Sequence, residues 1–310
     1  MNLRECALRA LVGLFVVALA IYLGITIVGQ VIPTWGATPS EVARSLPGDA
    51  LNTNPAVNWT HAITINAPAA SVWQWIAQIG ERRGAFYSYT FIENQMGNGD
   101  VYHNADHIVP EWQNPTPGIA LIGGSLPLRV AQVETGKWML ASSTGEMGWS
   151  WLWYLEPINV NQTRLLVRMK LQPTGMTSNS AMGTAIGLGA FVMEQSMLQG
   201  IQARAEGNIP PAYSESLEIA VWLFALAAGL IAGIFLLGFK AWKLPLAIGV
   251  LAISVLFFIT FWQPPIWTRV ILDIGLWGGV VWCGLRQSQG RRGQVISRDR
   301  PRPLKLKPLT

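Results

Sequence analysis

The sequence predicts an α+β domain, with an antiparallel sheet around a long C-terminal helix, that is joined to four transmembrane helices. Four long apolar stretches, one at the start of the chain and three after Leu217, enclose roughly 180 residues of ordinary polarity, about the size of one domain. Within those residues, the periodicity changes from one strand to two helices, then to a series of short strands and one long helix. Successive strands without helices between them form antiparallel sheets, which predicts the fold class.

The apolar stretches are long enough to cross a bilayer, because about 20 apolar residues form a helix that spans a hydrocarbon core of about 30 Å. The four predicted spans are residues 10–32, 219–239, 244–262 and 266–285. The last span carries Arg269 and Asp273, which are four residues apart, so we expect them to pair on one helix face. The first span is longer than the apolar part of a cleaved secretory signal, and no Ala-x-Ala site follows it, which favours an uncleaved anchor.

Positive charges predict the orientation of these helices. The basic residues beside the spans are Arg4, Arg9, Lys240, Lys243 and Arg286, and all of them fall on one side if four helices cross. The positive-inside rule then places both termini in the cytoplasm and the central domain on the outer face of the cell membrane. With eight Lys or Arg and one Asp, the tail after the last span carries +7, whereas the whole chain carries +5. The folded part is therefore about neutral, and we expect no nucleic-acid binding.

The expected boundaries divide the chain into five parts. These are an N-terminal transmembrane anchor (1–33), a linker (34–58), the α+β domain (59–207), three transmembrane helices (217–285) and a basic cytoplasmic tail (286–310). The linker is rich in Pro, Ala and Ser, so it is expected to be extended.

The first half of the domain is expected to contain one strand and two helices. Apolar and polar residues alternate around 63–65, which is typical of a strand, and Pro68 then suits the first turn of a helix. This helix is expected to end at Gly80, which can act as a left-handed cap. A second helix, 90–96, has Glu93 three residues after its first Thr, which is the spacing of a capping box.

Five further strands are predicted between turns rich in Gly, Pro and Asn. They cover residues 118–123, 126–134, 137–144, 149–156 and 163–172. Trp149, Trp151 and Trp153 occupy alternate positions, so they share one face of their strand. Residues 184–206 then return to helical periodicity. The expected core stripe of this helix consists of Phe191, Glu194, Leu198 and Ile201.

Several separated motifs occur in the order typical of one known group of domains. The motifs are LPGD at 46–49, VWQWIAQIG at 72–80, FYSY at 86–89, EN at 93–94, IVPEWQ at 108–113, FVME at 191–194 and RAE at 204–206. Residues 46–207 thereby resemble the SRPBCC superfamily, the START-like, helix-grip group that includes polyketide cyclases, lipid-transfer domains and the major birch pollen allergen. The resemblance implies an internal cavity that binds lipids, polyketides or other apolar molecules, but it implies no particular reaction. We expect no cofactor.

The expected ligand contacts come from the second helix, the strands and the long helix. They are Phe86, Tyr87, Tyr89, Glu93, Asn94, Trp149, Trp151, Arg164, Arg168, Glu194 and Leu198. A carboxylate among apolar residues, as at Glu93, needs a partner or has a raised pKa. Arg164 and Arg168 lie four apart on one strand face, and the pattern favours them as partners of Glu93 in a structural pair. The tryptophans are either core residues or the walls of a cavity for a large apolar molecule.

The leading hypothesis is a membrane-anchored START-like domain that binds a hydrophobic small molecule or lipid without catalysing a reaction. One alternative is a cyclase-like or dehydratase-like enzyme with Glu93, Asp106 or Glu111 as acid and base. Another is a scaffold or sensor domain. His103 and His107 are four residues apart, but no Glu follows the first and no third ligand is well spaced, so we expect no metal. Two small-x-x-x-small steps, Gly229 with Gly233 and Gly275 with Gly279, allow a packed bundle or a homo-oligomer.

Overall fold

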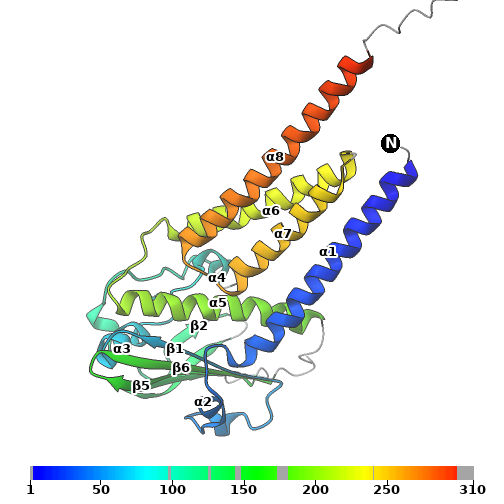
Figure 1. The fold of residues 1–310 in the computed structure, drawn as a ribbon. Helices are drawn as coiled ribbons and strands as arrows, with labels where there is room; N and C mark the ends of the chain where they lie inside the picture. Colours follow the sequence, from blue (N-terminus) through cyan, green and yellow to red (C-terminus); the bar gives the residue numbers. More distant parts are fainter. Residues whose placement is uncertain are drawn as a thin grey trace, which may run out of the picture. The chain divides into compact units, whose positions relative to one another are not determined.

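The computed structural model describes residues 3–96, 99–124, 127–143, 148–172, 181–239 and 241–298. The chain forms two compact units (Figure 1). One unit is Thr26–Glu215, and the other combines Met1–Ile25 with Ser216–Thr310. Several sequence features lie outside the described residues: Lys240, most of the loop before the long helix and the tail from residue 299.

The unit Thr26–Glu215 has the predicted α+β fold. Its helical elements are η1 (Ile32–Thr34), α2 (Pro39–Ala43), η2 (Asp49–Leu51), α3 (Ala69–Ala77), α4 (Thr90–Met96), η3 (Pro110–Trp112) and α5 (Ala181–Ala205). Its strands are β1 (Val57–Ile65), β2 (Ala120–Ile122), β3 (Leu128–Glu134), β4 (Trp138–Ser142), β5 (Ser150–Asn159) and β6 (Gln162–Leu171). The strands form one antiparallel sheet in the order β1-β6-β5-β4-β3-β2, and α3 and α5 pack on the same face of it (Figure 1). This is the helix-grip arrangement.

One helix ends earlier than the sequence predicts. α3 stops at Ala77 instead of Gly80, because the backbone of Gly80 exchanges two hydrogen bonds with Ala85 in a turn. Gly80 has a φ of 135°, which favours glycine, so its conformational freedom serves the turn and not the helix cap.

The register of the central strands divides the sheet residues between two faces. Trp59, Trp151 and Met169 lie side by side across β1, β5 and β6. We call their face, which carries α3 and α5, the inner face. The neighbouring positions of each strand point the other way and form the outer face, because side chains alternate along a β-strand. Arg164 and Arg168 lie on this outer face.

The segment that the sequence analysis treats as a linker packs on the outer face. Leu46 joins a buried cluster with Ala62, Leu140, Leu152 and Leu166 of four strands. Arg168 holds the same segment: its guanidinium donates to the Asp49 carboxylate at 2.8 Å and to the carbonyls of Glu41, Val42 and Arg44 at 2.7 to 3.0 Å. Residues 34–52 therefore complete the domain.

The second unit contains the four helices that are long and apolar enough to cross a membrane. They are α1 (Leu3–Val31), α6 (Ser214–Gly238), α7 (Lys243–Phe261) and α8 (Ile266–Arg298), although the last residues of α1 and the first of α6 belong to the other unit. α6, α7 and α8 share a buried apolar cluster, and an added Cβ at Gly229 would contact Ala252 of α7. Gly229 therefore serves packing within the chain, whereas a Cβ at Gly233 would meet no atom within 4 Å among the described residues. α8 continues past Leu285 as far as Arg298, because no proline interrupts it before Pro301.

The predicted pair between Arg269 and Asp273 is wrong. Arg269 instead donates to the Glu218 carboxylate of α6 at 2.9 Å and to the carbonyl of Pro264 at 2.7 Å. The i,i+4 spacing permits a pair within α8, but the partner on the neighbouring helix is available only in the folded unit.

We predict that Arg168→Met lowers the free energy of unfolding by about 3–5 kcal/mol, because it removes the donor of three carbonyls and one of the two cations that pair with Asp49. Urea unfolding of the full chain in mild detergent, followed by near-UV circular dichroism, measures this change. Arg129→Met is the control, since Arg129 is exposed and is expected to change stability by less than about 0.5 kcal/mol. Equal effects of the two substitutions would contradict the role of Arg168.

Candidate functional site

Aromatic side chains form a continuous layer on the inner face of β5. The ring centroids of Trp151 and Trp153 are 4.6 Å apart, and those of Trp149 and Trp151 are 5.8 Å apart. Phe86 stacks on Trp151 at 5.6 Å, and Tyr102 lies 5.8 Å from Phe86. We call these five residues the aromatic layer. The predicted sharing of one face is confirmed for Trp151 and Trp153 by the pairing of β5 with β6, and Trp149, just before β5, stacks on Trp151.

The three indoles of this layer have buried N–H groups without acceptors. Nε1 of Trp149, Trp151 and Trp153 makes no hydrogen bond to any part of the chain that the structure describes. A buried donor without an acceptor costs roughly 1–3 kcal/mol, and folded proteins leave few of them. Three in a row on one strand indicate a surface that accepts a further molecule, either water or a ligand.

The loop before α4 carries the strained backbone of this region. Arg82, Ala85 and Tyr87 have φ values of 55°, 54° and 58°, a region that residues other than glycine rarely adopt. Such strain persists where the surrounding structure holds it, often at binding sites. The loop also approaches α5 closely, because a Cβ at Gly200 would overlap the Tyr87 carbonyl oxygen. This close approach fixes the position of Phe86 against Trp151.

Glu93 is buried beside this loop without a partner. Its side chain is 5% exposed, and neither carboxylate oxygen accepts a hydrogen bond from a described residue. The predicted capping box is wrong, because the amide and the hydroxyl of Thr90 both donate to Glu215. The predicted pair with Arg164 or Arg168 is also wrong, since strand alternation puts both arginines on the outer face.

Burial, together with the negative charge of Glu215, raises the pKa of Glu93 to about 8. The carboxyl group is therefore mostly protonated at neutral pH. Burial and the charges of Glu81 and Glu93 raise the pKa of Tyr102 to about 12. The side chain of Asn94, the residue after Glu93, binds the backbone of Tyr102, so α4 lies beside this member of the aromatic layer. A protonated carboxyl among aromatic rings can donate one hydrogen bond and accept another.

A second buried acid, Glu194 of α5, pairs with a residue that the sequence analysis did not select. His61 of β1 contacts Glu194 Oε1 through Nδ1 at 2.6 Å and the carbonyl of Ile32 through Nε2 at 2.5 Å. Because a carbonyl only accepts, Nε2 carries a proton and the proton at Nδ1 is shared with Glu194. The alternation of Trp59, His61, Ile63 and Ile65 along β1 was the available signal, since it places His61 on the inner face.

Aromatic rings surround this imidazole. Trp59 stacks on it at 5.9 Å, and Phe191 and Trp35 meet it edge-on at 5.5 and 6.2 Å. Burial disfavours the charged ring, but the charge and the hydrogen bond of Glu194 outweigh it, and the pKa of His61 is raised. The pair holds η1, where the chain leaves α1, against β1 and α5.

Several other predicted contacts have structural partners. The Tyr87 hydroxyl donates to the Trp75 carbonyl at 2.9 Å, and the Asn94 side chain binds the backbone of Val101 and Tyr102. Tyr89 and Leu198 are buried in the core.

The other candidate acids lie on the surface. Asp106 is exposed and contacts the His107 ring at 2.7 Å, and Glu111 is exposed in η3. Neither resembles Glu93 in burial. Among the described residues, no group of three His, Cys, Asp or Glu side chains is placed to hold a metal ion.

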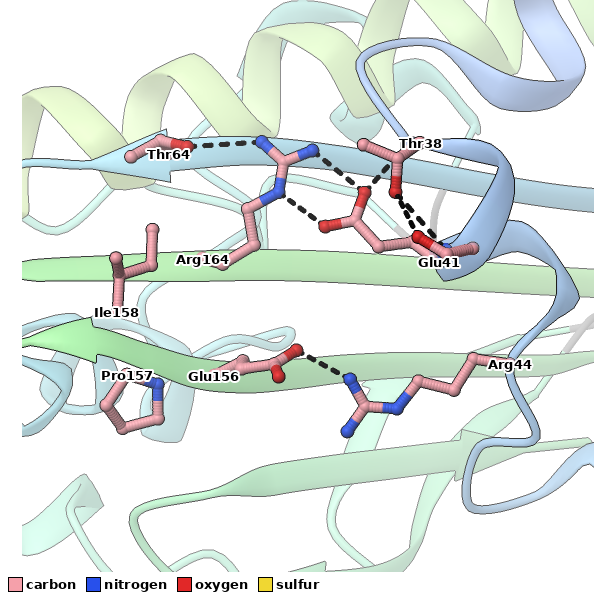
Figure 2. Close-up of a pocket in the computed structure, with 9 residues that line it drawn as sticks. Thr38, Glu41, Arg44, Thr64, Glu156, Pro157, Ile158 and Arg164 are labelled. Atoms are coloured by element: carbon pink, nitrogen blue, oxygen red, sulfur yellow. Dashed lines mark hydrogen bonds and ion pairs between the residues drawn. The ribbon is translucent and has the colours of Figure 1, made fainter.

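An open groove with a volume of about 540 Å³ lies on the outer face (Figure 2). Arg164 donates to both oxygens of Glu41 at 2.7 and 3.0 Å, and Arg44 contacts Glu156 at 2.6 Å. The hydrogen bond from Arg164 outweighs burial and lowers the pKa of Glu41 to about 2. The charged side chains of this groove thus pair with one another. By contrast, the indole N–H groups of the aromatic layer and the carboxyl of Glu93 have no partners among the described residues.

No family model and no curated protein matches the chain. Solved structures that it resembles include a protein from Thermobifida fusca, at 12% identity over 49% of this chain and 94% of that one, with a TM-score of 0.30. A conserved protein of unknown function from Enterococcus faecalis shares 9% identity over 51% and 75% of the two chains, with a TM-score of 0.28. The Zhui aromatase/cyclase from a Streptomyces species shares 12% over 50% and 96%, also with a TM-score of 0.28. Likenesses this distant are no guide to function.

We predict that the wild-type protein loses stability as pH rises from about 4.5 to about 8, because in this window folded Glu93 retains a proton that the unfolded chain has released. Glu93→Gln resembles the protonated form and does not titrate. Its free energy of unfolding should therefore decrease by less over this pH range, and the difference from the wild type should be on the order of 4 kcal/mol. The measurement is urea unfolding of the full chain in detergent across this pH range. Glu156→Gln on the outer face is the matched control and should keep the wild-type pH dependence.

We predict that His61→Leu lowers the free energy of unfolding by roughly 3–5 kcal/mol, because it leaves Glu194 as a buried charge without its partner. The double variant His61→Leu with Glu194→Leu should recover at least about 2 kcal/mol relative to the sum of the single changes. Urea unfolding of the four proteins of this double-mutant cycle measures the coupling. Simple additivity would show that the pair is not a unit.

Proposed function

We propose that the unit Thr26–Glu215 binds an apolar small molecule or lipid on the inner face of its sheet, between the aromatic layer and Glu93. One observation carries the proposal: the buried carboxyl of Glu93 and the three buried indole N–H groups of the aromatic layer have no partners among the residues described. The charged groups that line the groove on the outer face pair with one another, so they do not need a ligand as a hydrogen-bond partner.

The chemistry of the region fits such a ligand. Small-molecule sites combine apolar and aromatic walls with a few polar groups that orient the ligand. Here the walls are Phe86, Trp151 and Trp153, and the polar groups are the indole N–H donors and the carboxyl of Glu93. A ligand that bonds these groups regains free energy that the unliganded protein lacks, about 1–3 kcal/mol for each group. The aromatic rings must separate or change rotamer to admit it.

The membrane helices support a lipid or membrane-dissolved ligand. A domain joined to four apolar helices stays near the bilayer, which raises its effective concentration toward molecules that partition there. The basic residues Arg4, Arg9 and Lys243 favour cytoplasmic termini and a ligand-binding domain on the outer side. This location gives the domain access to lipids of the outer leaflet.

A second function, proton transfer to a bound substrate, is favoured by one observation. A carboxyl with a pKa of about 8 is protonated at neutral pH and can act as a general acid. Asp106 and Glu111 are exposed and do not provide a buried base beside it. Binding therefore remains the first proposal. A turnover assay with a bound compound would decide between the two, because Glu93→Gln should abolish turnover and preserve retention if the group is an acid.

We predict that the full chain, purified in mild detergent, retains an apolar compound that organic solvent extracts and mass spectrometry detects. Trp151→Ala should reduce the retained amount about tenfold or more, because it removes the ring at the centre of the aromatic layer. Trp138→Ala is the control, because Trp138 lies on the outer face and binds Glu134. A compound that is absent from the wild type, or that both variants retain equally, would contradict the proposal.

A further inference from the structure

The charge around Glu93 restricts what the proposed ligand can be. The other charged group that acts on its carboxyl is Glu215, which is also an acid and which holds Thr90 and Asn104 by hydrogen bonds. The nearby titratable group of the aromatic layer, Tyr102, has a pKa raised to about 12 by burial, Glu81 and Glu93, so it is neutral at ordinary pH. Arg204 lies within electrostatic reach of Glu215, whereas no cation acts on Glu93 among the described groups.

The arginines of the same part of the domain are already engaged. Arg204 donates to the carbonyls of Ala105 and Gly200 and lies over the ring of Tyr87, 4.7 Å from its centroid. Arg83 donates to the carbonyls of Ala77 and Trp112. Both guanidiniums are thus held by backbone acceptors, although the buried Nε of Arg83 has no acceptor among the described residues, and neither guanidinium contacts the carboxyl of Glu93.

The aromatic layer supplies the other half of a cation site. Phe86 and Trp151 stack with an interplanar angle of 21°, and Tyr102 lies beside Phe86. The faces of such rings are negative, and they attract an ammonium group more strongly when water is excluded. Asn94 joins α4, which carries the buried Glu93, to the backbone of Tyr102. Aromatic faces together with a carboxyl on a neighbouring element suit the recognition of an organic cation. An anionic headgroup would gain no ion pair from Glu93 and would keep its carboxyl protonated.

We infer that the ligand of this site is an apolar molecule with a cationic amine, whose ammonium group pairs with Glu93 while its apolar body lies against Phe86 and Trp151. The inference rests on the proposed function and narrows it to one ligand class. The amine donates to the two carboxylate oxygens that now have no partner, and it compensates the charge that burial disfavours.

Proton linkage makes this ligand class testable. The ammonium group pairs with ionised Glu93, so binding displaces the proton that the empty site holds at neutral pH. The affinity for an amine should therefore rise with pH until Glu93 is ionised in the free protein. A neutral ligand that accepts a hydrogen bond from the protonated carboxyl should show the opposite trend. The direction of the pH dependence distinguishes the two.

The test uses the full chain in detergent and three compact probes that differ only in their polar group: adamantylmethylamine, adamantylmethanol and adamantanecarboxylate. Isothermal titration calorimetry measures the affinity of each. We expect the amine to bind most tightly, with an affinity that rises about tenfold or more between about pH 6.5 and about pH 8.5. Titrations in buffers of different ionisation enthalpy should show proton release at the lower pH.

Two variants assign the effect to the carboxyl. Glu93→Gln should weaken amine binding about tenfold or more and abolish its pH dependence, whereas Glu156→Gln, on the outer face of the same sheet, should change neither. If Glu93→Gln does not fold, the pH series and the proton release of the wild type decide alone. Equal or tighter binding of the alcohol, or an amine affinity that stays constant or falls with pH, overturns the amine inference and leaves the proposed function intact. Failure of all three probes to bind counts against both.

Discussion

The alternation of side chains along β5 and β6 is the constraint on which the other features of the domain depend. Pairing of these two strands with β1 and β4 places Trp151 and Trp153 on the face covered by α3 and α5, and Arg164 and Arg168 on the opposite face. A shift of one residue would exchange these sets, bury two guanidiniums under the helices and expose the indoles. The distribution of charge between the two faces therefore follows directly from strand register.

The two faces differ in how their polar groups are satisfied. On the outer face, Arg168 makes five hydrogen bonds to Thr60, Asp49 and three backbone carbonyls, and these bonds hold residues 34–52 on the sheet. On the inner face, Glu93 and the indole N–H groups are buried without partners among the described residues. A domain is stable by only about 5–15 kcal/mol, so several unsatisfied groups are a large cost. Such a cost is expected at binding sites, where a ligand supplies the missing partners.

The His61–Glu194 pair connects three parts of the same unit. It joins β1 to α5, and through the Ile32 carbonyl it also holds the segment that follows α1. Gly36, a few residues later, has a φ of 70° and no room for a Cβ because of the Ala62 carbonyl, so the chain passes directly along the edge of β1. The residues that follow the first apolar helix are therefore part of the folded domain.

Local periodicity by itself indicated the six strands, the helices α3, α4 and α5 and the shared face of Trp149, Trp151 and Trp153, because these depend on residues close together in the chain, but it missed α2 in the predicted linker. Composition likewise determined the four apolar helices. Only the tertiary structure decided which charged groups meet. Arg269 donates to Glu218 and not to Asp273, and Arg168 donates to Asp49 and not to Glu93. At the start of α4, the Thr90 amide donates to Glu215 and not to Glu93. Sequence spacing shows which partners are within reach on one element, but a long charged side chain bonds to whichever acceptor the packing of distant elements brings to it.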